Sequence, residues 1–265
     1  MAEVIHRSVD SGLARIEPDD RLVVLARTIQ ASAPEAETAL EDGATHWARF
    51  GGACLGQALY RHRSVFHDAA ETPVWSHLEL SYFRGMVPAD VVLELVVNRQ
   101  PEGVHLLRAE ILLTTPSSFI LPRDWQGSAD RPERRVSLEY IQVQPKFLRE
   151  YREVMRSYCG LAAMKLVQAN RFGTFRAMET AAVLHRDREM NIDWNQIHLC
   201  ELDAGSFDGF GKEFAAALRA DLPNDVDVAD AFADLGRMRT VPRWTFNDAV
   251  VEADAALGTE GRSAP

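Results

Sequence analysis

Apolar and polar residues over positions 21–114 follow two periods, one typical of strands and one typical of helices. Alternating or β-branched runs predict four strands, and apolar residues three or four positions apart predict two helices. The predicted strands cover 21–30, 56–66, 74–83 and 104–115. The helices are predicted to begin near Pro34 and Pro88, because proline is favoured in the first turn of a helix. The first half therefore has the predicted order β-α-β-β-α-β.

The second half repeats this order after a segment without periodicity, in which Pro, Ser, Gly and Asp accumulate as in a linker. Its predicted strands cover 135–143, 172–185, 192–202 and 236–246, and its helices cover 145–170 and 206–221. A terminal helix is predicted at 247–257. We divide the chain into an N-terminal extension (1–20), a first repeat (21–114), a linker (115–134), a second repeat (135–256) and a disordered tail (257–265).

The third predicted strand of each half has a tryptophan near its beginning. The stretch "VWSHLELSYF" (74–83) aligns with "DWNQIHLCEL" (193–202), so that Trp75 matches Trp194. The two tryptophans are 119 residues apart. A repeat of that length is too long for a solenoid and indicates duplication of a whole small domain. Each unit is predicted to be an antiparallel sheet with two helices on one face, and its bare face must be buried. We therefore predict an α+β protein of two tandem ferredoxin-like repeats.

Composition narrows the possible functions. The formal net charge of -10 argues against a nucleic-acid binder and against docking on anionic lipid. Three cysteines at wide spacing, without a C-x-x-C pair, argue against a zinc site or a disulfide framework, and no metal is predicted. Neither a signal peptide nor a membrane-length apolar run is evident, which predicts a cytoplasmic protein. The glycine-rich, P-loop, G-x-S-x-G and H-E-x-x-H motifs are absent from the sequence.

The chain resembles the dimeric α/β-barrel superfamily, in which two ferredoxin-like units pair their sheets into a barrel. The run "EYIQVQP" (139–145) and the predicted helix after it resemble NIPSNAP-type members, which are similar to antibiotic-biosynthesis monooxygenases. Those members often have glycine after the proline, where this chain has Lys146. The resemblance covers 134–220 best and 21–113 only in pattern. It implies a single-chain barrel with a site between a sheet and its own helices.

Alternation along the third strands predicts an aliphatic face and a more polar face. Each tryptophan is predicted to share the polar face with every second residue of its strand. In the first half this face has Trp75, His77, Glu79 and Ser81, and in the second half Trp194, Gln196, His198 and Cys200. Solvated or barrel-lining side chains are the simpler interpretation of such a face. A pocket with a few convergent polar groups is the functional one.

The site that the resemblance implies in the second half has three catalytic candidates. His198 is the predicted proton acceptor, because an imidazole titrates near about 6.5. Tyr140 and Arg176 are predicted to stabilise a developing enolate or phenolate oxygen. The predicted substrate-binding residues are Trp194, Gln196, Gln142, Tyr158, Trp75 and His77. A purely structural role for His198 is the alternative.

The resemblance implies an oxygenase-like enzyme of secondary metabolism that acts on an apolar or aromatic small molecule. Such an enzyme requires no cofactor where the deprotonated substrate itself reacts with oxygen. Haem-using relatives leave haem open as a cofactor, with His198, His77 and His185 as candidate ligands. A non-catalytic ligand-binding or assembly protein is the other alternative. The expected partner is a small-molecule substrate, and a homo-oligomer is left open.

Overall fold

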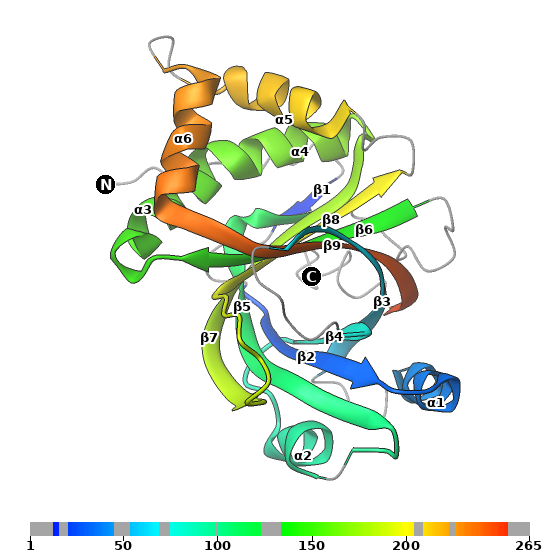
Figure 1. Ribbon diagram of the computed structural model, residues 1–265. Helices are drawn as coiled ribbons and strands as arrows, with labels where there is room; N and C mark the ends of the chain where they lie inside the picture. The colour runs from blue at the N-terminus through cyan, green and yellow to red at the C-terminus, as the bar shows by residue number, and fades with distance from the viewer. Residues whose placement is uncertain are drawn as a thin grey trace, which may run out of the picture.

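Eight antiparallel strands form a closed barrel at the centre of an α+β fold (Figure 1). The computed structural model describes residues 13–15, 21–44, 54–68, 75–98, 100–122, 134–203, 209–222 and 226–253. Around the barrel the strand order is β5-β2-β4-β3-β9-β6-β8-β7, and β7 pairs back with β5 to close the ring. The short strand β1 (Leu13–Arg15), in the expected N-terminal extension, pairs with the end of β5.

The first half contributes four strands and two helical segments. Its strands are β2 (Val23–Ala31), β3 (Cys54–Asp68), β4 (His77–Phe83) and β5 (Val104–Pro122). Helix α1 (Pro34–Ala44) connects β2 to β3, and α2 (Ala89–Val92) runs into a π-helical turn, η3 (Leu93–Val97), before β5. These elements agree with the predicted order β-α-β-β-α-β.

The second half has the same kinds of element in the same order, with longer helices. Its strands are β6 (Arg134–Val143), β7 (Phe172–Arg186), β8 (Gln196–Asp203) and β9 (Arg239–Ala253). Between β6 and β7 the chain forms η4 (Pro145–Phe147), α3 (Leu148–Val154), the π-helical turn η5 (Met155–Cys159) and α4 (Gly160–Gln168). Between β8 and β9 it forms α5 (Phe210–Arg219) and α6 (Val228–Met238).

Three predicted boundaries are wrong. Residues 115–122, predicted as the beginning of the linker, continue β5, and the rest of that segment up to 133 lies outside the described residues. Helix α6 was not predicted, although Asp227 gives it an N-cap. The predicted terminal helix is wrong as far as Ala253, because β9 continues to that residue. The tail, 257–265, lies outside the described residues.

Apolar side chains fill the barrel and the two layers between barrel and helices. Every second residue of β4 and β8 points into the barrel, among them Leu78, Leu80, Ile197 and Leu199. Outside the barrel, the second half has an extensive cluster under α3, η5, α4 and α6, and the first half has smaller clusters under α1 and α2. Figure 1 shows these two helix layers above and below the barrel. The molecule therefore has one closed barrel between two separate helix layers.

Replacing Asp227 with Ala is expected to lower the free energy of unfolding by about 1 kcal/mol, the usual effect of losing an N-cap. The Asp227 carboxylate accepts a hydrogen bond from the backbone nitrogen of Ala229 at 2.7 Å, and the variant leaves that donor without this acceptor. Urea unfolding followed by circular dichroism measures the change. Asp227→Asn, which keeps an acceptor at the same place, is the control and is expected to retain most of the stability.

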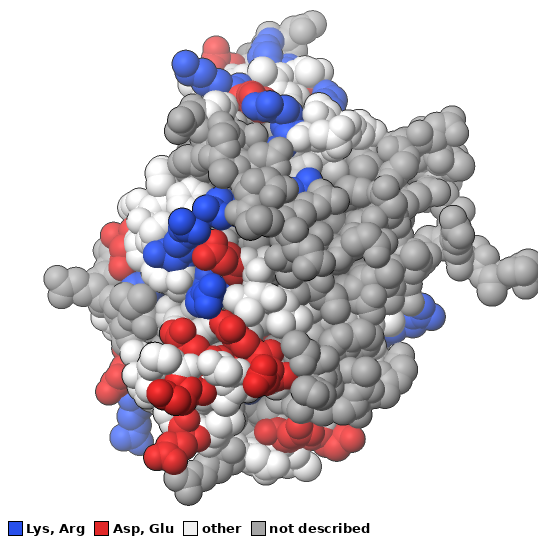
Figure 2. Space-filling view, turned by 90° about the vertical axis from the view of Figure 1, so that its right-hand side faces the viewer, with Lys and Arg blue, Asp and Glu red and all other residues white. Residues whose placement is uncertain are grey.

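Acidic side chains gather on the lower part of the face in Figure 2, the end of the molecule at which α1 lies in Figure 1. Helix α1 contributes Glu35 and Glu37 in its first turn. The described part of this face therefore has no continuous basic surface of the kind that nucleic-acid phosphates require. Within the described ranges, no helix has both the length and the apolar character needed to cross a membrane.

Candidate functional site

Ser76, the residue just before β4, and Asn195, the residue just before β8, make matching hydrogen bonds in the two halves. Ser76 donates its backbone N–H to Ile29 O at 2.9 Å, and Asn195 donates its own to Ile141 O at 2.9 Å. Their side chains also match. Ser76 Oγ accepts from Ala31 N at 2.7 Å, and Asn195 Oδ1 accepts from Val143 N at 2.8 Å.

The predicted face of the two tryptophans is wrong. Regular strand geometry begins only at His77 and Gln196, after Ser76 and Asn195, so the alternation does not extend back to the tryptophans. Trp75 and Trp194 belong to the barrel interior and are each 1% exposed. His77, Gln196 and His198 lie on the opposite face of the sheet, toward the helices.

Tyr140 lies between the two tryptophans inside the barrel, and the three rings form an aromatic triad. Its ring centroid is 4.9 Å from that of Trp75 and 4.9 Å from that of Trp194. Trp75 Nε1 donates to the Tyr140 hydroxyl at 3.2 Å. Arg243 lies over the Trp75 ring and Arg108 over the Trp194 ring, each at 4.2 Å from the ring centroid. The triad is a packed element of the barrel core. Tyr140, predicted to belong to a catalytic site next to the helices, therefore lies on the other face of the sheet.

Arg176 also points into the barrel, where it is fully buried. Its guanidinium forms an ion pair with Glu201 at 2.6 Å and donates to the hydroxyl of Tyr82 at 3.2 Å. The structure therefore does not bring the three predicted catalytic residues together. Tyr140 and Arg176 lie on the inner face of the sheet, and His198 lies on its outer face under α3.

On the outer face, His198 and Tyr151 are buried and form a polar cluster with the half-buried Glu139 and Arg239, which we call the His198 cluster. Glu139 on β6 is the register partner of His198 on β8. Arg239, at the start of β9, donates to the Tyr151 hydroxyl at 2.9 Å and lies 3.8 Å from a Glu139 carboxylate oxygen. The same hydroxyl lies 3.5 Å from His198 Nε2.

Burial determines the charge states in this cluster. Desolvation by burial, with a smaller contribution from the nearby Arg239 cation, holds the pKa of His198 well below its usual value. Burial likewise raises the pKa of the Tyr151 hydroxyl above its usual value. At neutral pH the cluster therefore presents a neutral imidazole, whose protonated form burial disfavours, beside a protonated phenol held by a guanidinium.

A partly open pocket of about 200 Å³ lies between α3, η5, α5 and α6, next to the His198 cluster. Its wall is mostly apolar and includes Tyr158, Leu218 and Leu235, with Glu150 and Asp234 among its lining residues. Cys159 and Met238 belong both to this wall and to the apolar cluster that surrounds Tyr151. We call this cavity the helix pocket. Through these two side chains the pocket wall is continuous with the apolar layer around Tyr151.

The remaining predicted binding residues are distributed over several places. Tyr158 lines the helix pocket, which lies among helices and not between the sheet and its helices as the resemblance implied. Gln196 is buried at the start of β8, opposite Glu179 of β7, and Gln142 is half-buried near the end of β6. His77 lies in the other half, with Nδ1 2.8 Å from Ser76 Oγ and Nε2 3.8 Å from Glu41 of α1. Burial lowers the pKa of His77 to about 4.

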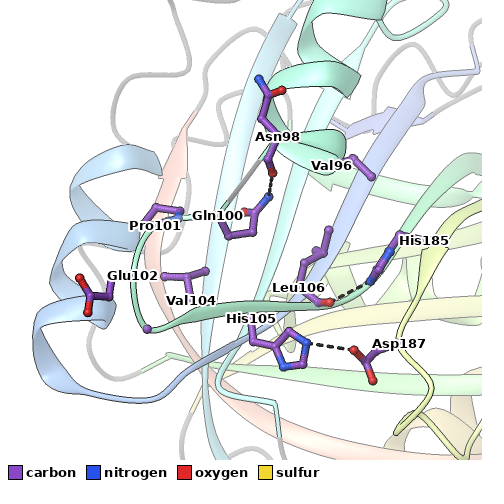
Figure 3. Close-up of a pocket in the computed structure, with 11 residues that line it drawn as sticks. Val96, Asn98, Gln100, Pro101, Glu102, Val104, His105, Leu106, His185 and Asp187 are labelled. Atoms are coloured by element: carbon purple, nitrogen blue, oxygen red, sulfur yellow. Dashed lines mark hydrogen bonds and ion pairs between the residues drawn. The ribbon is translucent and has the colours of Figure 1, made fainter.

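A second, more open cavity of about 430 Å³ lies between η3, the start of β5 and the end of β7 (Figure 3). Here His105 Nε2 lies 2.9 Å from Asp187 Oδ2, and His185 Nε2 lies 3.0 Å from the carbonyl oxygen of Leu106. The side chain of His105 is 54% exposed, so solvent screens its pair with Asp187. This cavity therefore lacks the buried, charge-determined environment of the His198 cluster.

The three histidines considered as haem ligands lie in surroundings that do not fit a haem. The His198 ring is stacked against Tyr151 and meets the Phe175 ring edge-on, and apolar side chains fill the rest of that layer. His77 lies under α1, and His185 faces an open cavity lined largely by polar groups. Haem requires an enclosed apolar pocket with an accessible axial imidazole. None of these three histidines offers that combination, and within the described residues no group of three or more His, Cys, Asp or Glu residues could hold a metal ion.

Two residues of the His198 cluster were missed by the sequence analysis. Tyr151 falls on the apolar stripe of the predicted helix 145–170, where an aromatic residue is expected to pack in the core. Arg239 falls at the start of the least regular predicted strand, 236–246. Because residues of strand 135–143 alternate between the two faces of the sheet, Glu139 shares the face toward the helices with apolar residues. A carboxylate in such surroundings was the one signal from which a basic partner could have been expected.

Comparisons with known proteins show the fold. No family model matches the sequence, and no curated protein matches it. Among solved structures, an anthrone oxidase-like protein is similar with a TM-score of 0.57 and 12% identity, covering 92% of this chain and 96% of that chain. A chlorite dismutase variant from Candidatus Nitrospira defluvii gives a TM-score of 0.48 and 9% identity, covering 91% and 94%. The likeness to the first extends over almost the whole of both chains, so the α/β-barrel fold is shared.

Proposed function

We propose that this chain is an oxidoreductase that oxidises a small aromatic molecule bound in the helix pocket, with His198 as the proton acceptor. The observation that carries the proposal is a neutral, buried imidazole beside a phenol and a guanidinium, directly behind the wall of an apolar pocket. Oxyanion stabilisation is assigned to Tyr151 and Arg239 instead of Tyr140 and Arg176, because only the former share the face of His198.

Access to His198 depends on Cys159 and Met238. Met238 is unbranched and can change rotamer without moving the backbone. Cys159 lies in the π-helical turn η5, and such turns are frequent at functional sites. Displacement of these two side chains joins the helix pocket to the His198 cluster. The volume of about 200 Å³ is below the range typical of drug-sized ligands, which restricts the substrate to a small molecule.

The chemistry suits a substrate with an acidic C–H or O–H next to an aromatic system. His198 takes the proton, and Tyr151 and Arg239 stabilise the resulting oxyanion, whose electrons then pass to molecular oxygen. The similar protein is described as anthrone oxidase-like, and anthrone is such a molecule. Anthrone and one dioxygen molecule give anthraquinone and water, so no other oxidant or reductant is needed.

Replacing His198 with Gln is expected to lower the turnover of anthrone by about 10²–10⁴-fold, the usual contribution of a general base. An oxygen electrode and the absorption spectrum of anthraquinone measure the rate. His77→Gln is the matched control, since it removes a buried histidine from the corresponding layer of the other half, and it is expected to retain turnover. Equal turnover in His198→Gln and wild type, with both proteins folded, contradicts the role of His198.

The binding-protein alternative predicts a different result. Fluorescence titration of the wild type with anthrone would then show saturable binding, lost when Tyr158 is replaced with Arg to fill the helix pocket, but no oxygen uptake. Binding without turnover contradicts an oxidase and leaves a ligand carrier of the same fold.

We also infer that the chain arose by duplication of one ferredoxin-like unit. The strand orders β5-β2-β4-β3 and β9-β6-β8-β7 are the same when the strands of each half are numbered along the chain. Ser76 and Asn195 also make the same types of hydrogen bond, one through the backbone N–H and one through a side-chain oxygen. Arg108 is the register partner of Thr28 in the first half, and Arg243 is the register partner of Tyr140 in the second half. The two arginines therefore occupy corresponding positions of the two halves. The NIPSNAP-like stretch 139–145 covers the end of β6 and reaches the first residue of η4, and it supports a common origin with that branch.

A further inference from the structure

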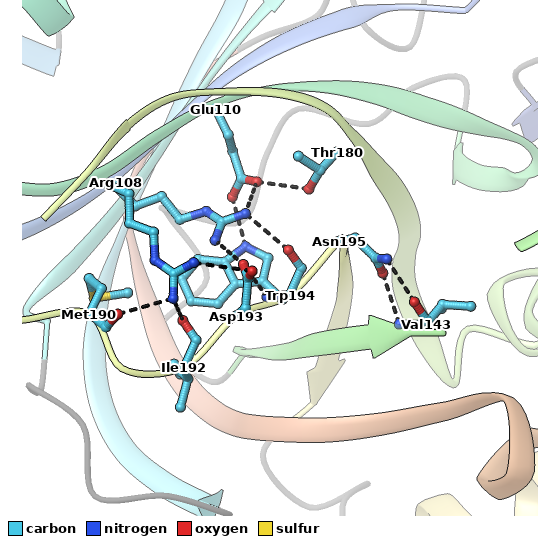
Figure 4. A network of polar contacts seen from close by, with 10 residues as sticks. Arg108, Glu110, Val143, Thr180, Met190, Ile192, Asp193, Trp194 and Asn195 are labelled. Carbon is cyan, nitrogen blue, oxygen red and sulfur yellow. Dashed lines mark hydrogen bonds and ion pairs between the residues drawn. The ribbon is translucent and has the colours of Figure 1, made fainter. Parts of the chain in front are cut away.

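A second chemically distinctive group lies inside the barrel, away from the proposed oxidase site. Trp194 Nε1 donates to Oε1 of Glu110 at 2.7 Å, and both side chains are about 1% exposed (Figure 4). The other carboxylate oxygen, Oε2, accepts from Arg108 at 2.9 Å and from the Thr180 hydroxyl at 2.8 Å. The indole N–H is therefore bonded directly to a buried carboxylate whose position is fixed by two further donors.

The Arg108 cation determines which oxidised form of Trp194 is accessible. Its guanidinium carbon lies 4.2 Å from the centroid of the indole ring. A cation over the ring face stabilises the neutral indole and repels a positive charge on it. One-electron oxidation of this ring is therefore favourable only if the indole proton leaves together with the electron. Glu110 Oε1 is the acceptor already in place for that proton.

We infer that Trp194 is a redox-active residue that gives an electron to a one-electron oxidant and its indole proton to Glu110. The N–H bond of Trp194 breaks, and an O–H bond forms on Glu110 Oε1. The products are a neutral indolyl radical, a carboxylic acid and the reduced oxidant. This function does not depend on the proposed oxidase site, and it gives the barrel a buried residue that holds one oxidising equivalent.

Proton transfer to Glu110 changes the charge of the network by one unit. After proton transfer Glu110 is neutral and Arg108 loses one counter-ion. Arg108 keeps the other, because its Nη1 lies 2.7 Å from Asp193 Oδ1. Because the electron leaves and the proton stays on Glu110, the network gains one positive charge, which is partly offset by Asp193, a half-exposed carboxylate that also pairs with Arg186. Figure 4 shows the Asp193 side chain next to the Arg108 guanidinium and close to Trp194, the residue that would be oxidised.

The other rings of the triad lack a comparable acceptor. Trp75 Nε1 donates to the Tyr140 hydroxyl, and a phenol oxygen is a far weaker base than a carboxylate. Burial raises the pKa of Tyr140 above its usual value, so its own proton is retained. Trp244, on β9, donates to the Ser137 hydroxyl at 2.6 Å. The radical is therefore expected on Trp194 alone among these residues.

Flash photolysis of the full-length protein with a ruthenium tris-bipyridine complex and a persulfate quencher tests the inference. The photogenerated Ru(III) is the one-electron oxidant, and transient absorption with rapid-freeze electron paramagnetic resonance detects the radical. The wild type is expected to give a neutral indolyl radical. Trp194→Phe is expected to lose this signal, and the matched variants Trp75→Phe and Trp244→Phe are expected to keep it.

Glu110→Gln separates the proton acceptor from general packing. It keeps the shape of the side chain but cannot take the proton as a carboxylate does, so the neutral radical is expected to be lost while the circular dichroism spectrum is retained. An unchanged neutral radical in folded Glu110→Gln overturns the assignment of the acceptor. A signal that persists in Trp194→Phe, or a wild type without an indolyl radical, overturns the inference itself.

Discussion

Replacement of Arg176 with Met is expected to lower the free energy of unfolding by about 3–5 kcal/mol, the usual result of removing one partner of a buried ion pair. Both Arg176 and Glu201 are fully buried, and their charged groups are 2.6 Å apart. Methionine keeps much of the volume but none of the charge, and it leaves the carboxylate with Arg134, which lies 3.2 Å from the other oxygen. Urea unfolding at neutral pH measures the loss.

The double variant Arg176→Met, Glu201→Leu is the control for this prediction. It removes both charges and is expected to regain much of the stability, because the desolvated carboxylate is no longer present. Replacing Arg237 with Met breaks an exposed pair with Glu150 and is expected to leave the stability almost unchanged. A stable Arg176→Met protein that has lost turnover would contradict the structural role and restore Arg176 as a catalytic candidate.

Trp75→Ala is expected to be the other strongly destabilising change, at about 3–5 kcal/mol. It opens a cavity in the barrel between Tyr140 and Trp194, and it removes the ring on which the buried guanidinium of Arg243 is stacked. The Tyr140 hydroxyl also loses the indole donor at 3.2 Å. Calorimetry and urea unfolding measure this effect independently.

The comparison for Trp75→Ala is Trp244→Ala. Trp244 is the same residue type on a barrel strand, but it is only half-buried, so its removal is expected to cost clearly less. Trp75→Phe is expected to lie between wild type and Trp75→Ala, because it keeps an aromatic ring but not the N–H donor. Equal losses for Trp75→Ala and Trp244→Ala would mean that the triad has no special part in the core.

The fold was largely accessible from the sequence because local periods and global topology agree. Alternation identified all eight barrel strands, at least in part, and helix periods identified α1, α2, the helices between β6 and β7, and α5. The failures lie where two signals compete. Residues 115–122 contain Pro and Ser, typical of a linker, yet they continue β5 by pairing with β1 and β7. Likewise, 247–253 contains helix-forming residues but completes the barrel by pairing with β3.

The candidate site was less accessible, for a geometric reason. Alternation along a strand assigns side chains to faces only while the strand is regular, and Ser76 and Asn195 interrupt it just after each tryptophan. The tryptophans therefore lie in the barrel interior with Tyr140, and not on the face that the alternation predicted. His198 was assigned to the correct face relative to Ile197 and Leu199. Its partners Tyr151 and Arg239 come from elements distant in sequence, and a contact of that kind has no local signal.

Both seams of the barrel, β3 with β9 and β5 with β7, join two parts of one polypeptide. A barrel assembled from two separate half-chains would come apart on dilution, since its two parts are held together only by mass action. Here covalent connection fixes the local concentration of each half around the other. The enclosed aromatic triad, which contains residues from both halves, is therefore preserved however scarce the protein becomes.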